Sequence, residues 1–525
     1  MLKKIYLALV ACVALLATGS CTGDLNQTPV IGENATTVYA SLQGYESVLA
    51  KIYGSYSLVG QQKADNKDLS SYNGQDLLRN YFNLQEAPTD ETAMRWLSGD
   101  NPSALTFMTW DATDSWVSDT YYRLYYTIAL CNEFLRYCTD DVLAGFDEIT
   151  RATIKTYAYE ARFMRALTYY LVLDLFRQGP FVDENTPSSG FTPEAYDGTK
   201  LFTYIESEIK DIETGLLDVA PYGRACKAAA WALAAKMYLN AEVYTGTSHA
   251  TDCITYCNKI LDCGRYSLEP DYRKLFNADN DKRTNEIIFA FASDAKEATT
   301  WGSGTYIVCG SCGSDSSQNP ADYGLASGWG SWRVRGEFYD LFTDGAADHR
   351  CLFWTDGQSQ YLDTAIDDGT QGYYSEKWTN LTDDGLAASD YGADGCNTDF
   401  PMFRLADVYL MAAEAVLRGG AGMARDRAIE LMNMLRERAY GNYTGYVADS
   451  QFTLDFIIAE RGRELYHECT RRTDLVRFGL FTTANYLWQW KGGVVDGRAV
   501  SDRYNIYPIP ATELSANPNL TNPLY

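Results

Sequence analysis

Residues 405–438, LADVYLMAAEAVLRGGAGMARDRAIELMNMLRER, decide the fold because they contain two amphipathic helical patterns and the turn between them. Apolar residues recur at helical spacing in 405–418 and again in 424–438. Gly419-Gly-Ala-Gly422 separates the two runs, and glycine clusters are typical of turns. The small residues of Ala412-Ala-Glu-Ala415 would let paired helices approach closely. This stretch therefore predicts a helical hairpin.

The same pattern recurs upstream and predicts an array of hairpins. One run covers Cys226–Tyr244 with small residues at Ala228–Ala235, Thr245-Gly-Thr247 forms a turn, and a second run covers Asp252–Cys263. Further runs with helical spacing are Tyr45–Tyr56, Trp116–Tyr137, Ile149–Phe176, Leu201–Leu216 and Leu454–Phe478. Paired amphipathic helices with small residues at their crossings are typical of tetratricopeptide-like repeats, which have a period of about 34 residues. Because the full consensus is absent, we predict a mostly α fold of degenerate repeats, wound as a right-handed superhelix.

Two regions interrupt the helical pattern. Residues 267–400 are rich in Gly, Ser, Asp, Asn and aromatics, which predicts a loop-rich insertion with short strands such as Glu286–Phe291 and Thr305–Cys309. Residues 57–112 have a similar character. The helical scaffold is predicted over about 40–266 and 401–480. Since loops on a rigid scaffold commonly carry function, the functional surface is expected from about 60–110 and 295–340.

The first twenty residues predict export and lipidation. Two lysines precede the apolar run Ile5–Ala17, which is too short to cross a bilayer but suits a signal peptide. Thr18-Gly-Ser20 followed by Cys21 is similar to a bacterial lipobox, so we predict a signal peptide at 1–20 and a lipid on Cys21 of a mature chain 21–525. Acyl chains would then hold the protein on a membrane. The alternative is a simple secretory signal with a chance cysteine. Asp24 is a weak indication of display at the cell surface.

Composition limits the classes of partner and chemistry. The net charge of −25 opposes binding to nucleic acid, which basic surfaces bind, and 46% hydrophobic residues indicate a globular chain. Forty tyrosines and eleven tryptophans are mostly core residues, but they also serve exposed amphipathic sites. Three histidines leave little material for zinc or histidine catalysis. Cys309-Gly-Ser-Cys312 is a lone CxxC, and a metal site needs a second pair.

Six segments in order carry a resemblance to a known family. The chain resembles the SusD/RagB family of Bacteroidota outer-membrane nutrient-binding lipoproteins over nearly its whole length. The matching segments are Cys21–Pro29, Asn83–Glu91, Glu160–Leu167, Arg404–Leu410, Glu460–Gly479 and the tail Tyr507–Pro523. The runs Arg472–Thr483 and Tyr486–Gly493, with Gly304–Gly310 and Ser327–Trp329, look especially like the starch-binding member of the family.

This resemblance implies a non-catalytic role. It implies a lipoprotein of the outer membrane, anchored at Cys21 and facing the cell surface. It also implies binding of starch or maltooligosaccharide and delivery to a SusC-like TonB-dependent transporter, without a cofactor. The same role for a different glycan remains open.

Sugar chemistry and the resemblance together nominate site residues. A sugar ring has an apolar face and a rim of hydroxyls, so its site needs flat aromatics with polar groups at their edge. Trp96, Trp301 and Trp329 lie in the loop regions and look like the aromatic arc of the starch-binding member, which has a Tyr in place of Trp301. The alternative is that each tryptophan is a packing residue. The polar candidates are Arg79, Asn101, Asp100 and Asp76. Lesser candidates are Trp332, Trp378 and Tyr323.

Two acidic clusters allow other functions. Glu460, Arg461, Arg463, Glu464 and 471–474 form the densest charge cluster, for which we favour a structural ion-pair network over an acid/base pair of Glu464 and Asp474. The oxygen donors of Asp279, Asp281 and Glu286 suit a structural Ca²⁺, but the spacing of a complete loop is absent and a solvated turn is the simpler interpretation.

Two rival functions remain open. A glycoside hydrolase needs two carboxylates about 5–10 Å apart, and no acidic pair in a recognisable hydrolase motif stands beside the loop tryptophans. A helical-repeat scaffold that binds only protein partners would have no affinity for soluble glycan.

Overall fold

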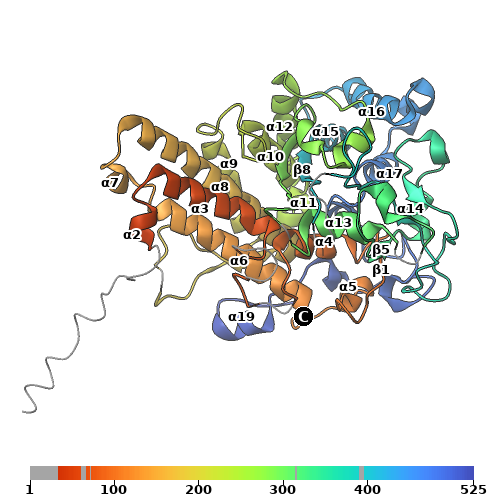
Figure 1. Cartoon of the computed structure of the whole chain (residues 1–525), viewed down its shortest axis with the longest axis horizontal. Coiled ribbons are helices and arrows are strands. Elements are labelled where there is room, and N and C mark those ends of the chain that lie inside the picture. Colours follow the sequence, from red (N-terminus) through yellow and green to blue (C-terminus); the bar gives the residue numbers. More distant parts are fainter. Residues whose placement is uncertain are drawn as a thin grey trace, which may run out of the picture. The chain divides into compact units, whose positions relative to one another are not determined.

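The computed structural model describes residues 34–60, 67–70, 73–187, 189–298, 300–313, 316–388 and 395–525. The chain divides into a short unit, Met1–Val48, and a large unit, Leu49–Tyr525 (Figure 1). The predicted signal peptide, Cys21 and Asp24 lie outside the described residues. In the short unit, α2 (Ala35–Val38) begins at Asn34, whose side chain accepts a hydrogen bond from the Thr37 backbone N–H at 3.0 Å. The helix α3 (Leu42–Ser57) crosses the boundary between the units.

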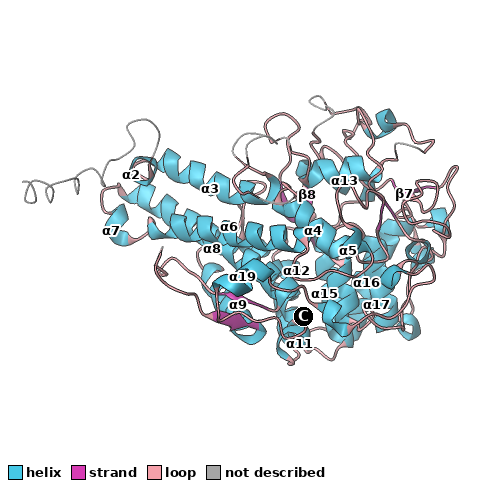
Figure 2. Cartoon of the chain, turned by 90° about the horizontal axis from the view of Figure 1, so that it is seen from below, coloured by secondary structure: helices cyan, strands magenta, loops and turns pink. Residues whose placement is uncertain are grey.

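Long helices form the first part of the large unit. The helix α6 (Ser115–Arg136) packs against α8 (Glu148–Phe176), and α8 also packs against α9 (Gly198–Ile212). Asp147 begins α8 by accepting from the backbone N–H groups of its first turn, and Arg177 ends it in the left-handed region, at φ 58°. Figure 2 shows that helices dominate and strands are few.

The two predicted hairpins are confirmed. The helices α10 (Lys227–Leu239) and α12 (Ala250–Asp262) pack together, as do α15 (Leu405–Leu417) and α16 (Arg425–Tyr440). The helix α15 also contacts α12, so the hairpins stack into the array that the sequence predicts. The alanines of Ala228–Ala235 are buried, which allows the close approach. Gly441 ends α16 at φ 67°, a conformation that favours glycine.

Two predicted helices are broken in the structure. The run to Tyr244 divides at Asn240 into α10 and α11 (Ala241–Thr245). The run from Leu454 divides into α17 (Leu454–Leu465) and α18 (Arg471–Arg477), because His467 and Cys469 take left-handed conformations at φ 58°. The His467 backbone N–H donates to Glu91 Oε2 at 2.8 Å rather than continuing the helix. A distant contact thus overrides the local periodicity.

The remaining elements, inside and outside the loop-rich regions, are short apart from α4 and α13. Every sheet of the described residues is two-stranded and antiparallel, in the pairs β1–β5, β2–β3, β4–β8 and β6–β7. The strands are β1 (Ala93–Met94), β2 (Gln178–Pro180), β3 (Ala195–Asp197), β4 (Ile287–Phe291), β5 (Trp332–Arg333), β6 (Phe353–Trp354), β7 (Tyr374–Ser375) and β8 (Phe400–Arg404). The helices are α4 (Leu77–Glu86), α5 (Ser103–Thr106), α7 (Asp140–Leu143), α13 (Ser303–Ser311), α14 (Gly336–Tyr339) and α19 (Ala511–Ala516). The 3-10 turns are η3 (Tyr272–Phe276), η4 (Asn280–Lys282), η5 (Pro320–Tyr323), η6 (Gly345–Ala347), η7 (Tyr443–Gly445), η8 (Asp449–Gln451), η9 (Lys491–Gly493) and η10 (Asp502–Asn505).

One of the two predicted strands is wrong. The strand predicted over Glu286–Phe291 is β4, but Thr305–Cys309 lies inside the helix α13. This helix is buried throughout and packs against α4 and β5. Tertiary burial outweighs the preference of its β-branched residues for strands. The buried helix α4, in the region predicted as loop, was also missed.

The dense charge cluster is a buried ion-pair network, as predicted. Glu460 pairs with Arg350, Arg436 and Arg463 at 2.7–2.8 Å, and Glu464 pairs with three arginines that include Arg350 at 3.0 Å and Arg404 at 2.6 Å. Burial alone would raise the pKa of Glu464, but the three guanidinium groups outweigh it and hold the pKa at about 2. Such a carboxylate stays ionised at neutral pH and cannot act as a general acid.

The described residues have neither a metal-binding cluster nor a membrane-spanning helix. No cluster of three or more His, Cys, Asp or Glu with metal-binding geometry occurs in them. Glu286 instead bonds to Arg404 and Arg438, while Asp279 bonds to Lys282, so the calcium prediction gains no support from their contacts. No helix of this described part combines the length and apolarity needed to cross a membrane.

Candidate functional site

The helix α4 supplies the base of the site. Its N-cap is Asp76, whose Oδ1 accepts a hydrogen bond from the Arg79 backbone N–H at 2.9 Å. The side chain of Arg79 therefore leaves the first turn of a fully buried helix in a fixed direction. An acidic residue followed by an apolar run is a common helix start, and this signal in the sequence could have revealed α4.

Asp76 holds the loop that carries Trp301. Thr300 Oγ1 donates to Asp76 Oδ2 at 3.0 Å, and the Ser303 backbone N–H donates to Asp76 Oδ1 at 3.3 Å. A Cβ at Gly302 would lie 2.0 Å from Asp76 Oδ2, so only glycine fits between them. Burial raises the pKa of the Asp76 carboxyl, which is fully buried. These contacts give Asp76 a positioning role, and its predicted contact with sugar stays untested.

Arg79 joins two loops of the site. Its Nη1 donates to the Trp301 carbonyl at 2.8 Å, and its Nη2 pairs with Asp100 Oδ2 at 2.5 Å. The guanidinium lies over the Tyr306 ring, 4.0 Å from its centre, and makes a cation–π contact with it. Arg79, one of the polar candidates, is 3% exposed, so the protein itself occupies most of the guanidinium group. Its Nε has no hydrogen-bond partner among the described residues.

Trp301 and Trp329 form an exposed aromatic pair. Their ring centroids are 5.9 Å apart and their planes meet at 41°. Trp301 is 45% exposed, and Trp329 is half-buried. The Trp329 backbone N–H donates to the Cys309 carbonyl at 2.8 Å, so its loop rests on α13. The pair is thus a tilted aromatic contact that remains partly accessible to solvent.

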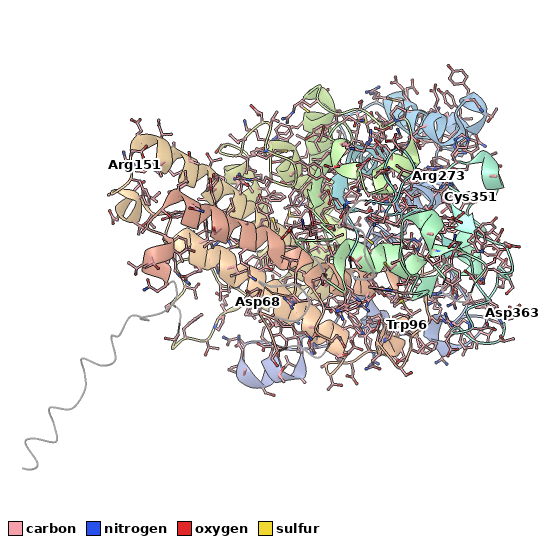
Figure 3. The ribbon with its side chains drawn as sticks, viewed as in Figure 1. Asp68, Trp96, Arg151, Arg273, Cys351 and Asp363 are labelled. Carbon is pink, nitrogen blue, oxygen red and sulfur yellow. The ribbon has the colours of Figure 1, made fainter. Side chains whose placement is uncertain are left out.

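The β1–β5 ladder brings Trp96 to the same place. Ala93 pairs with Arg333 and Met94 with Trp332, and the Arg95 backbone N–H continues the ladder by donating to Ser331 at 2.8 Å. Trp96 follows Arg95 directly, and Ser331 lies two residues after Trp329. Trp96 is 37% exposed and lies at the surface near β1 and α5 (Figures 1 and 3). The structure therefore brings the rings of Trp301 and Trp329 into contact, and Arg79, which bonds to both the Trp301 carbonyl and Asp100, joins their surface to the loop of Trp96.

Asp100 and Asn101, the polar candidates that follow Trp96, differ in their contacts and in their exposure. Asp100 pairs with Arg79 through its carboxylate, and its carbonyl accepts from Trp116 Nε1 at 2.9 Å. Asn101 is exposed and takes a left-handed conformation at φ 55°, which asparagine tolerates. Its amide is the candidate group with the freest access to a ligand. The lesser candidates Trp332, Trp378 and Tyr323 are buried, at 8% exposure or less, so they do not belong to this surface.

Sequence reasoning missed a pocket that Trp96 lines. An open pocket of about 410 Å³ is lined by Arg95, by residues 96–99 and by Asp367, which comes from a loop 270 residues later. The loop of Asp367 lies close to this segment. A Cβ added at Gly369 would be only 3.1 Å from the Arg95 guanidinium carbon. No local pattern in the sequence pairs these two segments.

Comparison with known proteins defines the class. A model of the SusD family matches residues 354–525. The starch-binding protein SusD of Bacteroides thetaiotaomicron is 33% identical over 99% of this chain and 98% of its own length. This chain therefore belongs to the SusD family.

Solved structures share the fold. A SusD homolog from Bacteroides thetaiotaomicron superposes with a TM-score of 0.73 at 17% identity, covering 93% of this chain and 98% of its own. Surface glycan-binding protein A of the same organism, solved in complex with laminarihexaose, superposes with a TM-score of 0.68 at 18% identity, covering 92% and 99%. At these identities the likeness shows the mostly helical fold and nothing finer.

Proposed function

We propose that this protein binds starch or maltooligosaccharide without acting on it chemically, and that the glycan lies across Trp96, Trp301 and Trp329. The observation that carries the proposal is the tilt of 41° between the ring of Trp301, which is exposed, and the ring of Trp329, which is half-buried. Successive sugar rings of an α-glucan turn along a curve, whereas those of a flat glycan stay close to one plane. Two aromatic faces at an angle suit the curved chain, and Trp96 extends the arc.

Polar groups at the edge of the arc would hold the hydroxyls. Asn101 offers both an amide donor and a carbonyl acceptor at the surface. Asp100 and Asp367, which lines a pocket with Trp96, add carboxylate acceptors, and the pairing with Arg79 restrains Asp100. The name of the starch-binding relative, at 33% identity over nearly the whole chain, supports the same ligand class.

The setting that we propose is the outer face of an outer membrane. There a lipid on Cys21 would tether the protein, and a TonB-dependent transporter would receive the glycan. Replacing Cys21 with Ser should move the protein from the membrane fraction to the soluble fraction. If the Cys21→Ser protein stays in the membrane fraction, the proposed lipid anchor on Cys21 is wrong. This outcome does not depend on which glycan the protein binds.

Calorimetry with maltoheptaose tests the ligand. The wild-type protein should give saturable heat, and the double variant Trp96→Ala, Trp329→Ala should give none. Trp231→Ala is the matched control, because Trp231 is a half-buried tryptophan of α10. Binding that survives the double variant would remove the site assignment. Heat with laminarihexaose but not with maltoheptaose would replace starch with a β-glucan, and release of reducing ends would overturn the non-catalytic role.

A further inference from the structure

A second polar pocket lies on the scaffold, away from the tryptophans. Its volume is about 280 Å³, and it is formed by the segment 342–344, α16, the loop 446–451 and α17. In Figure 1 the helix α16 lies at the upper right of the large unit, and β1 and α5 lie at the lower right. A volume near the lower end of the ~300–1,000 Å³ typical of ligand pockets suits one ring rather than an oligosaccharide.

One exposed tyrosine lines this pocket, and a second one packs against the first. Tyr446 lines it and is 41% exposed, and Tyr443 beside it is 69% exposed. Their ring centroids are 5.2 Å apart and the planes meet at 75°. The Tyr446 hydroxyl donates to Glu437 Oε2 at 2.6 Å, which fixes the orientation of its ring. A fixed, exposed aromatic face is what a sugar ring needs for stacking.

The walls carry hydrogen-bonding groups of both kinds. Arg436 and Arg463 line the pocket, and each uses three of its five N–H donors within the protein. Asp344 is exposed and accepts from the Tyr440 hydroxyl at 2.6 Å through Oδ2, and Gln451 adds an exposed amide. Donors and acceptors therefore surround a space of the size of one ring.

The charges of the pocket favour a neutral ligand. Both arginines are paired with Glu460, at 2.8 Å from Arg436 and 2.7 Å from Arg463. The exposed carboxylate of Asp344 and the net charge of −25 oppose an anionic ligand. A neutral ring with many hydroxyls meets these conditions better than a phosphate or a uronic acid.

We infer that the pocket between α16, the loop 446–451 and α17 binds one pyranose unit of a neutral glycan, with stacking on Tyr446 and Tyr443. The inference rests on the proposed glycan binding and adds a second contact for the same polymer. Two sites on one chain would favour long polysaccharides, because binding at the first site raises the effective concentration at the second.

Retardation in native gels containing soluble starch, laminarin or xyloglucan tests the inference. The protein variants are wild type, Tyr443→Ala with Tyr446→Ala, Trp96→Ala with Trp329→Ala, and all four changes together. On the glycan that retards the wild type, the tyrosine variant should bind at least ~10-fold more weakly, since two-site avidity is commonly worth 10²–10⁴-fold. The tryptophan variant should keep weak retardation that the four-change variant loses. Phe191→Ala, at an exposed aromatic elsewhere, should match the wild type.

The outcomes separate the two proposals. If the tryptophan changes abolish retardation and the tyrosine changes leave it unaltered, the second site is wrong and the first stands. If only a β-glucan retards the protein, starch is wrong and the tyrosine variant still decides the second site on that glycan. If no glycan retards the wild type, both proposals fail. Thermal unfolding checks that each variant is folded, and Tyr446→Phe, which keeps the ring, should retain binding if stacking is the cause.

Discussion

The buried charge network of the scaffold and the tryptophan surface are held in place in opposite ways. Glu464 is fully buried and bonds to three arginines from three segments. If one of these ion pairs is lost, the other two still hold the carboxylate in place. The tryptophan surface depends on a few bonds from two residues, Asp76 and Arg79. The difference indicates that changes in the scaffold should act on stability, and changes at the surface on binding.

The largest effect is expected from Glu464→Ala. This change leaves three buried guanidinium groups without one of their carboxylates, and breaking a buried pair costs about 3–5 kcal/mol. Chemical denaturation should show that loss in the free energy of unfolding. Glu430→Gln is the control, because Glu430 pairs with Arg427 at the surface, where such pairs contribute about 0–1 kcal/mol. Equal losses in the two variants would contradict the structural role of the network.

The next effect, on both stability and binding, is expected from Gly302→Ala. Its Cβ would collide with the Asp76 carboxylate, which must move and release Thr300 and the Trp301 loop. Overpacking of this kind costs about 1–3 kcal/mol. The free energy of unfolding and the affinity for maltoheptaose, measured by titration, should both fall. Gly145→Ala should change neither, since a Cβ there meets nothing within 4 Å. An unchanged titration for Gly302→Ala would show that the loop needs no such support.

A smaller effect is the pH dependence from Glu91, which joins the scaffold to the loops through His467. Burial raises the pKa of Glu91 from its ordinary 4.5 to about 7. Between these values the folded chain keeps a proton that the unfolded chain has lost, so the free energy of unfolding falls as pH rises. Burial lowers the pKa of His467 to about 3, which gives the opposite slope between about 3 and 6.5.

The variant Glu91→Gln distinguishes the contribution of Glu91 to the pH dependence of the free energy of unfolding from that of His467. Its side chain has no proton to lose, so the part of the fall that Glu91 contributes between pH 4.5 and 7 should be lost from denaturation curves. Other buried groups, such as Asp399 with a pKa raised by burial to about 7 and His467, contribute in both proteins. The difference between wild type and variant therefore reports the titration of Glu91 together with that of Glu86, the neighbouring carboxyl whose own pKa is raised by burial and by Glu91. A difference that does not depend on pH would show that Glu91 is not protonated in the folded chain.

Sequence patterns predicted the scaffold better than the site. Helical spacing located the hairpins because local apolar periodicity and tertiary packing agree there. The pattern failed at α13, where burial makes a helix of a β-branched run, and at His467, where a contact with Glu91 breaks a helix. The family resemblance nominated the three tryptophans, which remain a prediction, but nothing in the sequence nominated Asp367, because no local signal reports a contact between segments 270 residues apart.

The smallest effect is expected from Trp301→Tyr, which sharpens the comparison. A tyrosine keeps a stacking face at this position, and the loop contact with Arg79 uses the backbone carbonyl rather than the indole. Affinity for maltoheptaose should therefore change by less than the ~0.5–1.5 kcal/mol that an aromatic contact is worth, whereas Trp301→Ala should lose that amount. Neither variant should alter the free energy of unfolding, because Trp301 is 45% exposed. If the tyrosine variant loses as much affinity as the alanine variant, the indole contributes by its size or its N–H, and stacking alone does not explain the site.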